Sequence, residues 1–201
     1  MLIYKGTTNQ FKEDVLNNRL ADLLASVFKE HYGRNALPNE YRSWSNSCQH
    51  VKNIIDIAKL NDNMIALEYE VPYNTSRIDC MLFGKGEDEK AYAVLIELKQ
   101  WNSVEELDEE GNFVETFTGR AQRRVAHPSQ QVEGYHNHLI SFVQVFEVDP
   151  DYDLYSCAYC HNYEKESGEG LFAERYKKIV DQFPVYAKDD VQALAGKLKS
   201  L

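Results

Sequence analysis

The sequence has no long hydrophobic run. None of its apolar stretches approaches the roughly 20 residues that a membrane-spanning helix needs. The N-terminal segment MLIYKGTTNQF has one lysine and a short apolar patch, which is not the pattern of a secretory signal. The sequence therefore predicts neither membrane insertion nor secretion.

Cysteine and net positive charge are also scarce. Four cysteines without a secretory signal predict reduced thiols and a cytoplasmic protein. The net charge of −10 excludes a protein that coats nucleic acid through its overall charge, so any phosphate contact must come from a local basic cluster. The pattern GxxxxGK[ST] is absent, so the chain has no P-loop for ATP of its own.

What is present predicts one α/β domain. Hydrophobic residues make up 43% and charged residues 27%, as in ordinary globular proteins. Three consecutive strands are expected to form a meander at the centre of the sheet, with Pro72 and Asn74 turning the chain between the first two. The acidic segment 104–119 is expected to be an exposed hairpin or loop. Periodicity predicts helices at about 9–31, 44–60, 127–142 and 189–200, and strands at 64–71, 77–84, 91–101 and 152–163.

Charged side chains interrupt two of the predicted strands. Asp79 lies in RIDCMLFG, and Glu97 and Lys99 come at the end of the apolar run in AYAVLIELKQW. Strand side chains alternate between faces, so Glu97 and Lys99 point the same way, with Asp79 on the neighbouring strand. Two adjacent carboxylates repel each other, and Mg²⁺ or Mn²⁺ would remove that conflict. The pattern predicts metal-assisted phosphodiester hydrolysis; the alternative is a Glu–Lys pair at a solvated strand end.

These residues resemble the D…(D/E)xK signature of the PD-(D/E)xK nuclease superfamily. Between Asp79 and Glu97-Leu98-Lys99 there are 17 residues, and QVEGY further on resembles the QxxxY motif of the RecB-like branch. Ile78 stands where the family name has proline, at a position that varies among members. The resemblance covers about residues 10–165 and implies a restriction-endonuclease-like core. That core is a central mixed sheet in αβββαβ order, flanked by helices and followed by a C-terminal helical extension over about 170–201 within a single domain of 1–201.

The resemblance also implies roles for individual residues. Lys99 would act on the attacking water or the transition state, and Gln131 and Tyr135 would support the site or hold the nucleic-acid backbone. Without the resemblance, these two would be a surface glutamine and a tyrosine packed in a core stripe. The implied metal ligands are Asp79, Glu97, the backbone carbonyl of Leu98 and, as the best match on the first helix, Glu30.

The wider pattern resembles the N-terminal part of a bacterial protein family. In that family, a domain of this kind precedes a superfamily 1-like helicase or ATPase with Schlafen-like relatives. The resemblance implies DNA or RNA as the substrate, and a helicase or ATPase domain as a partner within the full-length protein.

Basic residues offer candidate phosphate contacts. Arg120, Arg123 and Arg124 lie in GRAQRRVAH, directly before the QxxxY helix, where the alternative is a solvated loop that balances the acidic hairpin. Arg77 shares a face with Asp79 and would contact a phosphate or form an ion pair with Asp79 or Glu70. Glu68 and Glu70 alternate on the first strand of the meander, which is typical of a solvated strand face; the alternative is that either acid supports the site from behind the metal ligands.

Two further hypotheses stay open beside an active nuclease. One is a nuclease-like domain without catalysis that binds nucleic acid or docks a protein. The other is a zinc or redox module built on Cys157 and Cys160, although a lone CxxC supplies only half of the usual zinc ligands. A buried strand is the simpler interpretation of that cysteine pair. His161, Asn162 and Tyr163, which follow the strand, are expected to line the cleft.

Overall fold

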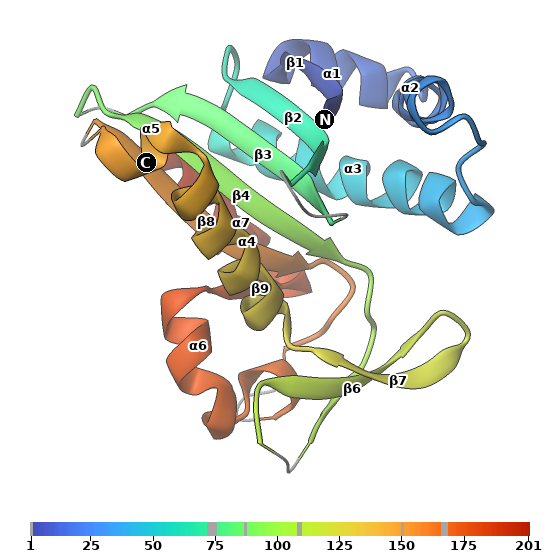
Figure 1. Cartoon of the computed structure of the whole chain (residues 1–201), viewed down its shortest axis with the longest axis vertical. Coiled ribbons are helices and arrows are strands. Elements are labelled where there is room, and N and C mark those ends of the chain that lie inside the picture. The colour runs from blue at the N-terminus through green and yellow to red at the C-terminus, as the bar shows by residue number, and fades with distance from the viewer. Residues whose placement is uncertain (1, 72–75, 87, 108–109, 150, 166–168) are drawn as a thin grey trace.

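The centre of the molecule is a mixed β-sheet (Figure 1). The computed structural model of the chain describes residues 2–71, 76–86, 88–107, 110–149, 151–165 and 169–201. Within these ranges six strands form the sheet, in the order β1-β2-β3-β4-β8-β9. Strands β1 to β4 pair antiparallel, whereas β8 runs parallel to β4, and β9 parallel to β8. The strands are β1 Leu2–Thr7, β2 Met64–Glu70, β3 Arg77–Lys85, β4 Ala91–Lys99, β8 Tyr152–Cys160 and β9 Val185–Ala187.

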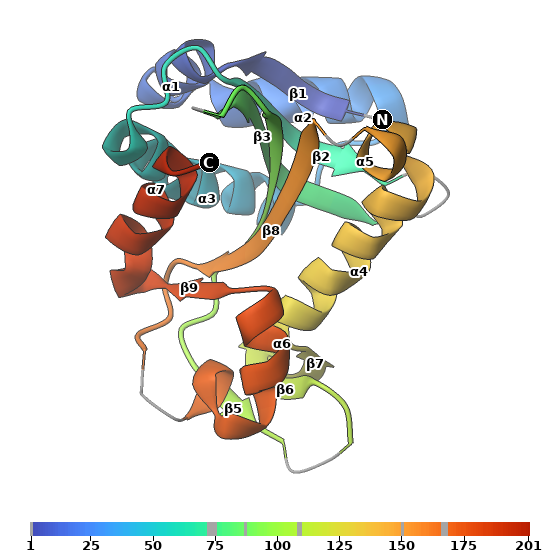
Figure 2. The ribbon, with the colours of Figure 1, turned by 90° about the vertical axis from the view of Figure 1, so that its left-hand side faces the viewer.

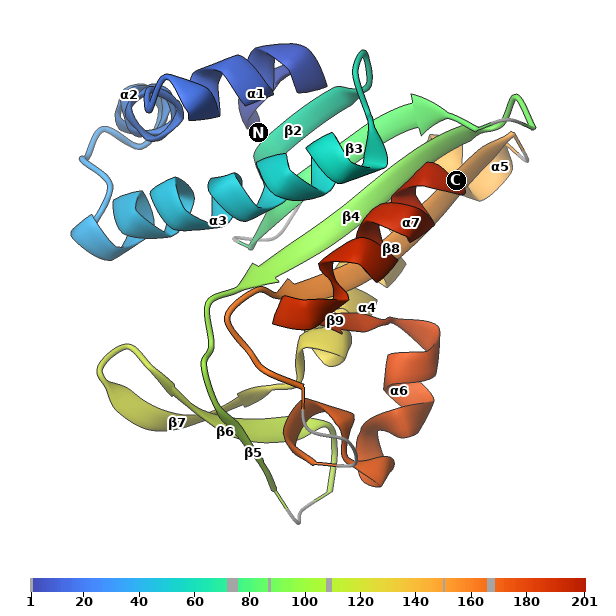
Figure 3. The same ribbon diagram turned by 180° about the vertical axis from the view of Figure 1, so that it is seen from behind.

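Helices cover both faces of this sheet (Figures 2 and 3). Each face buries its own apolar core, and β4 contributes to both, with Ile96 in the first core and Leu95 in the second. The mixed α/β class, the central meander and the two-sided burial of β4 are therefore confirmed. The first face carries α1 Thr8–Leu16, α2 Leu20–Tyr32, α3 Pro38–Ala58 and α7 Val191–Lys199; the second carries α4 Pro128–Phe142, α5 Gln144–Val148 and α6 Lys177–Gln182.

A second, smaller sheet projects from the end of β4 (Figure 1). It consists of β5 Val104–Glu106, β6 Phe113–Thr118 and β7 Ala121–Ala126, paired antiparallel in that order. Gly119 and Arg120, both with positive φ, make the two-residue turn between β6 and β7. The acidic segment thus forms a hairpin, but it is not exposed throughout, because Val114 and Thr116 are buried. The basic segment after it is a strand rather than a solvated loop.

Two other predictions differ from the structure, and one falls outside the residues it describes. The expected helix over 9–31 is broken between α1 and α2, where Asn18 has a φ of 54° and Leu16 is 71% exposed. Asparagine tolerates this left-handed conformation better than most residues, so the break overrides the apolar periodicity. The helix predicted from about residue 44 begins at Pro38 instead, since proline suits the first turn of a helix. The turn expected at Pro72 and Asn74 lies outside the described residues.

The C-terminal part is not only helical. Strand β9 extends the main sheet beside β8, and α7 packs in the first core. Three 3-10 helices connect these elements: η1 Gly170–Phe172, η2 Glu174–Tyr176 and η3 Lys188–Asp190. Among the described residues, no helix combines the length and apolar character needed to cross a lipid bilayer.

His127 caps the N-terminus of α4, the helix that carries the predicted QxxxY motif. Its Nδ1 accepts a hydrogen bond from the Ser129 N–H, and its Nε2 lies 3.1 Å from the carbonyl oxygen of Leu171. These contacts require the neutral ring, with the proton on Nε2. Burial lowers the pKa of His127 to about 4, in spite of the hydrogen bond to Leu171.

We expect the stability to fall as the pH drops from 7 to 5. The unfolded chain protonates His127 near pH 6.5, whereas the folded chain keeps it neutral down to about 4, so acid favours unfolding in that window. The contribution of His127 at pH 5 is about 2 kcal/mol. Urea unfolding at both pH values should show a smaller pH effect for His127→Asn than for wild type. His31→Asn, a change on the surface, should behave like wild type, and an equal pH effect in all three proteins would contradict the assignment.

Candidate active site

Three carboxylates lie in one row across β2, β3 and β4. The register of the pairs on either side places Glu68 opposite Asp79, and Asp79 opposite Glu97. The row lies near the carboxyl end of β4. There the last β3–β4 pair is Cys80 with Ile96, and Asp79 and Glu97 are the next residues along the two strands. The meander therefore brings together acids that are far apart in the sequence.

Glu68 has an unusual backbone for a residue inside a strand. Its φ is 53°, in the left-handed region that few residues other than glycine adopt. The alternation of faces is reset there: Leu67 packs in the first core, whereas Tyr69 packs against the second. The Glu68 side chain turns toward α3, where Trp44 Nε1 donates a hydrogen bond to Oε1 over 2.8 Å. Backbone strain of this kind is found preferentially at functional sites.

Asp79 is half-buried between the two strand ends. Its Oδ2 accepts a hydrogen bond of 2.8 Å from the Leu98 N–H. Burial, followed by the negative charges of Glu97 and Glu68, raises the pKa of Asp79 well above its ordinary range. The Lys99 charge and the Leu98 N–H act in the opposite direction but do not outweigh these effects. The acids therefore repel each other in a poorly solvated position.

Glu97 and Lys99 meet the side chains of α4. Lys99 Nζ lies 2.6 Å from Glu97 Oε1 and donates a hydrogen bond to Gln131 Oε1 over 2.8 Å. Gln131 Nε2 donates to the same Glu97 Oε1 at 2.7 Å and to the Tyr135 hydroxyl at 3.0 Å. The structure thus brings Glu97, Lys99, Gln131 and Tyr135 into one connected group.

The second oxygen of Glu97 has no such partner. Glu97 is 3% exposed, and within the described part of the chain its Oε2 is buried without a hydrogen-bond donor. A buried carboxylate oxygen without a donor is costly and is rare in native proteins. A positive charge or a donor placed at this oxygen would remove that cost.

Lys99 is held as an ammonium ion. Burial acts to lower the pKa of Lys99, but the charges of Glu97 and Asp79 outweigh it, so the pKa lies above its ordinary value. A lysine in that state donates hydrogen bonds and positive charge, and it does not accept a proton at neutral pH. The geometry therefore supports a role in stabilising negative charge rather than a role as a base.

A small cavity borders the row on its α3 side. It has a volume of about 20 Å³ and is lined in part by Glu68, Asp79, Leu98 and Ser47. That volume is enough for about one water molecule.

Within the described ranges, no group of three or more His, Cys, Asp or Glu side chains could hold a metal ion. Mg²⁺ commonly takes only one or two protein carboxylates and completes its shell with water and substrate oxygens, so Asp79 and the unpartnered Glu97 oxygen fit it.

Comparisons with protein family models, curated proteins and solved structures find no match for this chain. No relative therefore assigns a function to the row of acids. The chemistry of the side chains is the basis on which its function is inferred.

Of the remaining sequence candidates, Glu30 has no contact with the row among the described interactions, and Arg77 contacts it through Glu68. Glu30 is exposed near the end of α2, and the charges that act most on Asp79 are those of Glu97, Glu68 and Lys99. Glu30 was selected by its position along the first helix, which does not predict where the side chain points. Arg77 forms ion pairs with Glu40 at 2.9 Å and Glu68 at 3.2 Å. It therefore has a supporting role through ion pairs, but these partners differ from the expected Asp79 or Glu70.

The three arginines after the acidic hairpin are spread over β7 and its turn. Arg120 is in the turn, and Arg123 and Arg124 are consecutive residues of β7 that point to opposite faces. The Arg124 guanidinium lies 3.5 Å from the centre of the Phe113 ring. Contact of these arginines with a phosphate stays a prediction.

The cysteine pair does not form a metal or redox site. On a strand, side chains three residues apart point to opposite faces, and Cys157 lies in the first core while Cys160 lies in the second. Burial raises the pKa of Cys160 to about 12, which disfavours the thiolate that zinc binding and disulfide exchange require. The hypothesis of a zinc or redox module is therefore wrong, and the buried strand is confirmed.

A buried polar network holds the chain just after Lys99. His161 Nε2 lies 3.1 Å from Ser47 Oγ, which also accepts a hydrogen bond from Gln100 Nε2. The His161 backbone N–H donates to the Lys99 carbonyl over 3.1 Å. Burial lowers the pKa of His161 to about 4, so the ring is neutral at physiological pH. Ser47 and Gln100 were missed from the sequence, because only the folded contact between α3 and the end of β4 makes them neighbours.

Proposed function

We propose that this chain is a divalent-metal-dependent nuclease domain with a restriction-endonuclease-like core, which hydrolyses phosphodiester bonds in DNA or RNA. The observation that carries the proposal is the buried Glu97 Oε2, which lacks a donor beside the acid Asp79. A bound cation would satisfy that oxygen and relieve the repulsion between the two acids.

The order of elements supports this core. Helices α2 and α3 are followed by the β2–β3–β4 meander, then by α4 and the parallel strand β8, which is the order αβββαβ. The D…ExK residues lie at the ends of β3 and β4, and Gln131 and Tyr135 lie on α4. This placement agrees with the one that the resemblance implies for PD-(D/E)xK nucleases.

Each side chain has a defined task in this scheme. Asp79, Glu97 and the carbonyl of Leu98 would hold Mg²⁺ or Mn²⁺, and a metal bound there supplies charge that polarises a phosphodiester and acidifies water. Lys99 donates hydrogen bonds to the negative charge that develops on the phosphoryl oxygens. Gln131 orients both Lys99 and Glu97, because its carbonyl oxygen accepts from one and its amide donates to the other.

A domain without catalysis is the competing proposal. It is favoured by the lack, among the described residues, of a group of three acidic, histidine or cysteine side chains that could hold a metal. In that case the acid row would be structural, and the chain would bind nucleic acid or a protein partner without cleavage.

Divalent-metal binding separates the two proposals. We expect Mn²⁺ to raise the melting temperature of wild type, and to support cleavage of at least one of linear, circular and single-stranded DNA and RNA. Glu97→Gln should lower metal affinity by about 10–100-fold, because it removes the charge of a ligand. Glu105→Gln, an exposed acid on β5, is the matched control and should behave like wild type. A wild-type protein that neither responds to Mn²⁺ nor cleaves any substrate would establish the domain without catalysis.

A further inference from the structure

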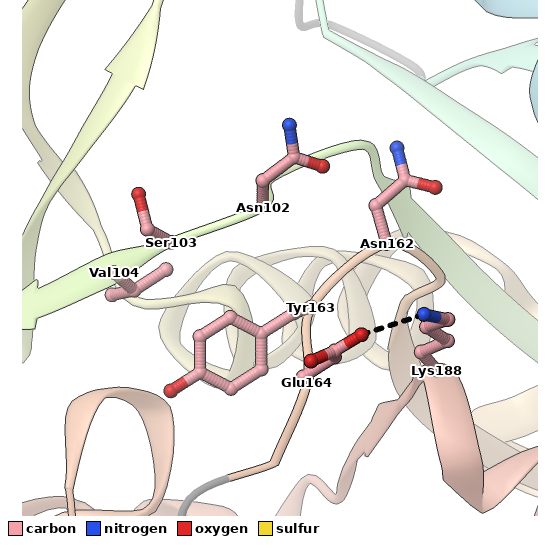
Figure 4. Close-up of a pocket in the computed structure, with 7 residues that line it drawn as sticks. All are labelled: Asn102, Ser103, Val104, Asn162, Tyr163, Glu164 and Lys188. Atoms are coloured by element: carbon pink, nitrogen blue, oxygen red, sulfur yellow. Dashed lines mark hydrogen bonds and ion pairs between the residues drawn. The ribbon is translucent and has the colours of Figure 1, made fainter.

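A larger cavity lies at the carboxyl ends of the neighbouring parallel strands β4 and β8 (Figure 4). Its volume is about 500 Å³, and it is lined by residues 102–104, residues 162–164 and Lys188. In sheets of this kind, ligands bind preferentially beyond the carboxyl ends of parallel strands. The volume is within the range of pockets that hold small organic groups.

The walls of this cavity are tied to the proposed active site. Lys99 and Cys160 are the last pair of β4 and β8, and both walls continue from there. Asn162 Nδ2 donates a hydrogen bond to the carbonyl oxygen of Gln100 over 3.3 Å. Asn102 is three residues after Lys99, so their Cα atoms are no more than about 11 Å apart. A group bound in the cavity would therefore lie beyond the same strand ends as a phosphate at Lys99.

The polar groups of the cavity suit an uncharged ligand. Lys188, the basic residue among the described lining residues, is 2.7 Å from Glu164 Oε1, so its charge is already compensated. A phosphate would need a free cation. In the described part of the chain, the Asn102 carboxamide and the Ser103 hydroxyl have no hydrogen-bond partner, and both come from one wall of the cavity (Figure 4). The Asn162 carboxamide on the other wall is engaged, since its Oδ1 lies 3.1 Å from His161 Nδ1 and its Nδ2 donates to Gln100.

Carboxamides match the edges of nucleobases. A carboxamide presents a donor and an acceptor next to each other, which is the pattern that base edges also present. Val104 and the Tyr163 ring supply an apolar part of the wall against which a flat ring can lie (Figure 4). The combination fits a planar, uncharged heterocycle with hydrogen-bonding edges.

We propose that this cavity binds one unstacked nucleobase of the nucleic-acid substrate, adjacent to the phosphate at the Lys99 site. The inference rests on the proposed function for the identity of the ligand. It adds a subsite through which the chain would prefer single-stranded or frayed substrate, since a paired and stacked base cannot enter the cavity.

Binding to abasic probes tests this subsite without cleavage. The protein is the full wild-type chain with EDTA, which suppresses metal-dependent cleavage, and the probes are single-stranded 12-nucleotide DNA and RNA oligonucleotides in which one abasic position is moved stepwise. We expect one position to weaken binding by about 10-fold, as measured by fluorescence anisotropy. Adding Asn102→Ala and Ser103→Ala should weaken binding of the intact probe to the same extent and abolish the response to that position. Both side chains are exposed, so these changes leave the core intact, and Asn39→Ala on α3 is the matched control.

The outcomes separate this inference from the proposed function. If the abasic effect is the same with and without Asn102 and Ser103, the subsite is wrong, even where the wild type cleaves nucleic acid. If the abasic effect depends on these two residues but the wild type cleaves nothing, the subsite stands and the nuclease function fails. Absence of measurable binding to every probe would overturn the subsite as well.

Discussion

Replacing Lys99 with methionine is expected to lower Mn²⁺-dependent cleavage about 10³-fold. The Lys99 ammonium is positioned by Glu97 Oε1 at 2.6 Å and Gln131 Oε1 at 2.8 Å, so it is organised before substrate arrives. Removing one preorganised donor to developing negative charge costs about 10²–10³ in rate, and the loss of a full charge puts the effect at the upper end. Initial rates on the best substrate, at saturating Mn²⁺, measure the change.

Folding of this variant has to be checked, because it leaves Glu97 buried without its cationic partner. Lys99→Arg keeps the charge but not the compact shape of the ammonium, so we expect it to fold and to lose at least 10-fold in rate. Lys5→Met, an exposed change on the edge strand β1, should cleave at the wild-type rate. Cleavage at wild-type rates by both Lys99 variants would remove Lys99 from the chemistry.

The sequence predicts the centre of the fold better than its periphery. The strands of the meander were predicted within two residues, because the run AYAVLI is apolar without interruption and occurs where a strand is buried on both faces. Strands β1 and β9 were not predicted, because both lie at edges of the sheet and β9 has only three residues. Such strands are defined by the neighbour they pair with more than by their own pattern.

Spacing alone placed Glu97 and Lys99 on one face of β4 and Gln131 and Tyr135 on one face of α4. Only the fold could show that these two faces meet, through the hydrogen bonds between Gln131 and the Glu97–Lys99 pair. The burial of Glu68 could not be predicted from strand alternation. Its alternation with Glu70 is typical of a solvated strand face, yet Glu68 is 8% exposed, since the left-handed backbone turns it inward toward Trp44. Burial, only partly offset by Arg77, raises the pKa of Glu68, so the row contains a third acid under strain.

Asp79→Asn is expected to stabilise the metal-free protein at pH 8, by about 1 kcal/mol. The asparagine carbonyl can still accept the Leu98 N–H, and the repulsion from Glu97 and Glu68 is removed. The pH dependence of this gain follows from the difference between the pKa of Asp79 in the folded and the unfolded chain. The folded-state pKa of Asp79 is raised, so the penalty for ionising it is absent below about pH 4, grows as the pH rises through the raised pKa, and is complete above it. The gain should therefore be larger at pH 8 than at pH 4, as thermal unfolding with a chelator would show.

Mn²⁺ should make the wild type more stable than Asp79→Asn, the reverse of their order without metal. A ligand that binds only the folded state stabilises it by about 2.7 kcal/mol at 100 times its dissociation constant. Wild type would gain this amount, whereas Asp79→Asn, which lacks a metal-binding carboxylate, would gain little. The two melting temperatures should thus cross as Mn²⁺ is added, and Asp62→Asn, a change at an exposed acid in the loop before β2, should follow wild type throughout. If Mn²⁺ stabilises Asp79→Asn as much as wild type, the cation binds elsewhere. If Asp79→Asn is less stable than wild type without metal, the Asp79 carboxylate contributes favourably to folding. Repulsion that is relieved only by the cation would explain why the fold retains two buried acids side by side.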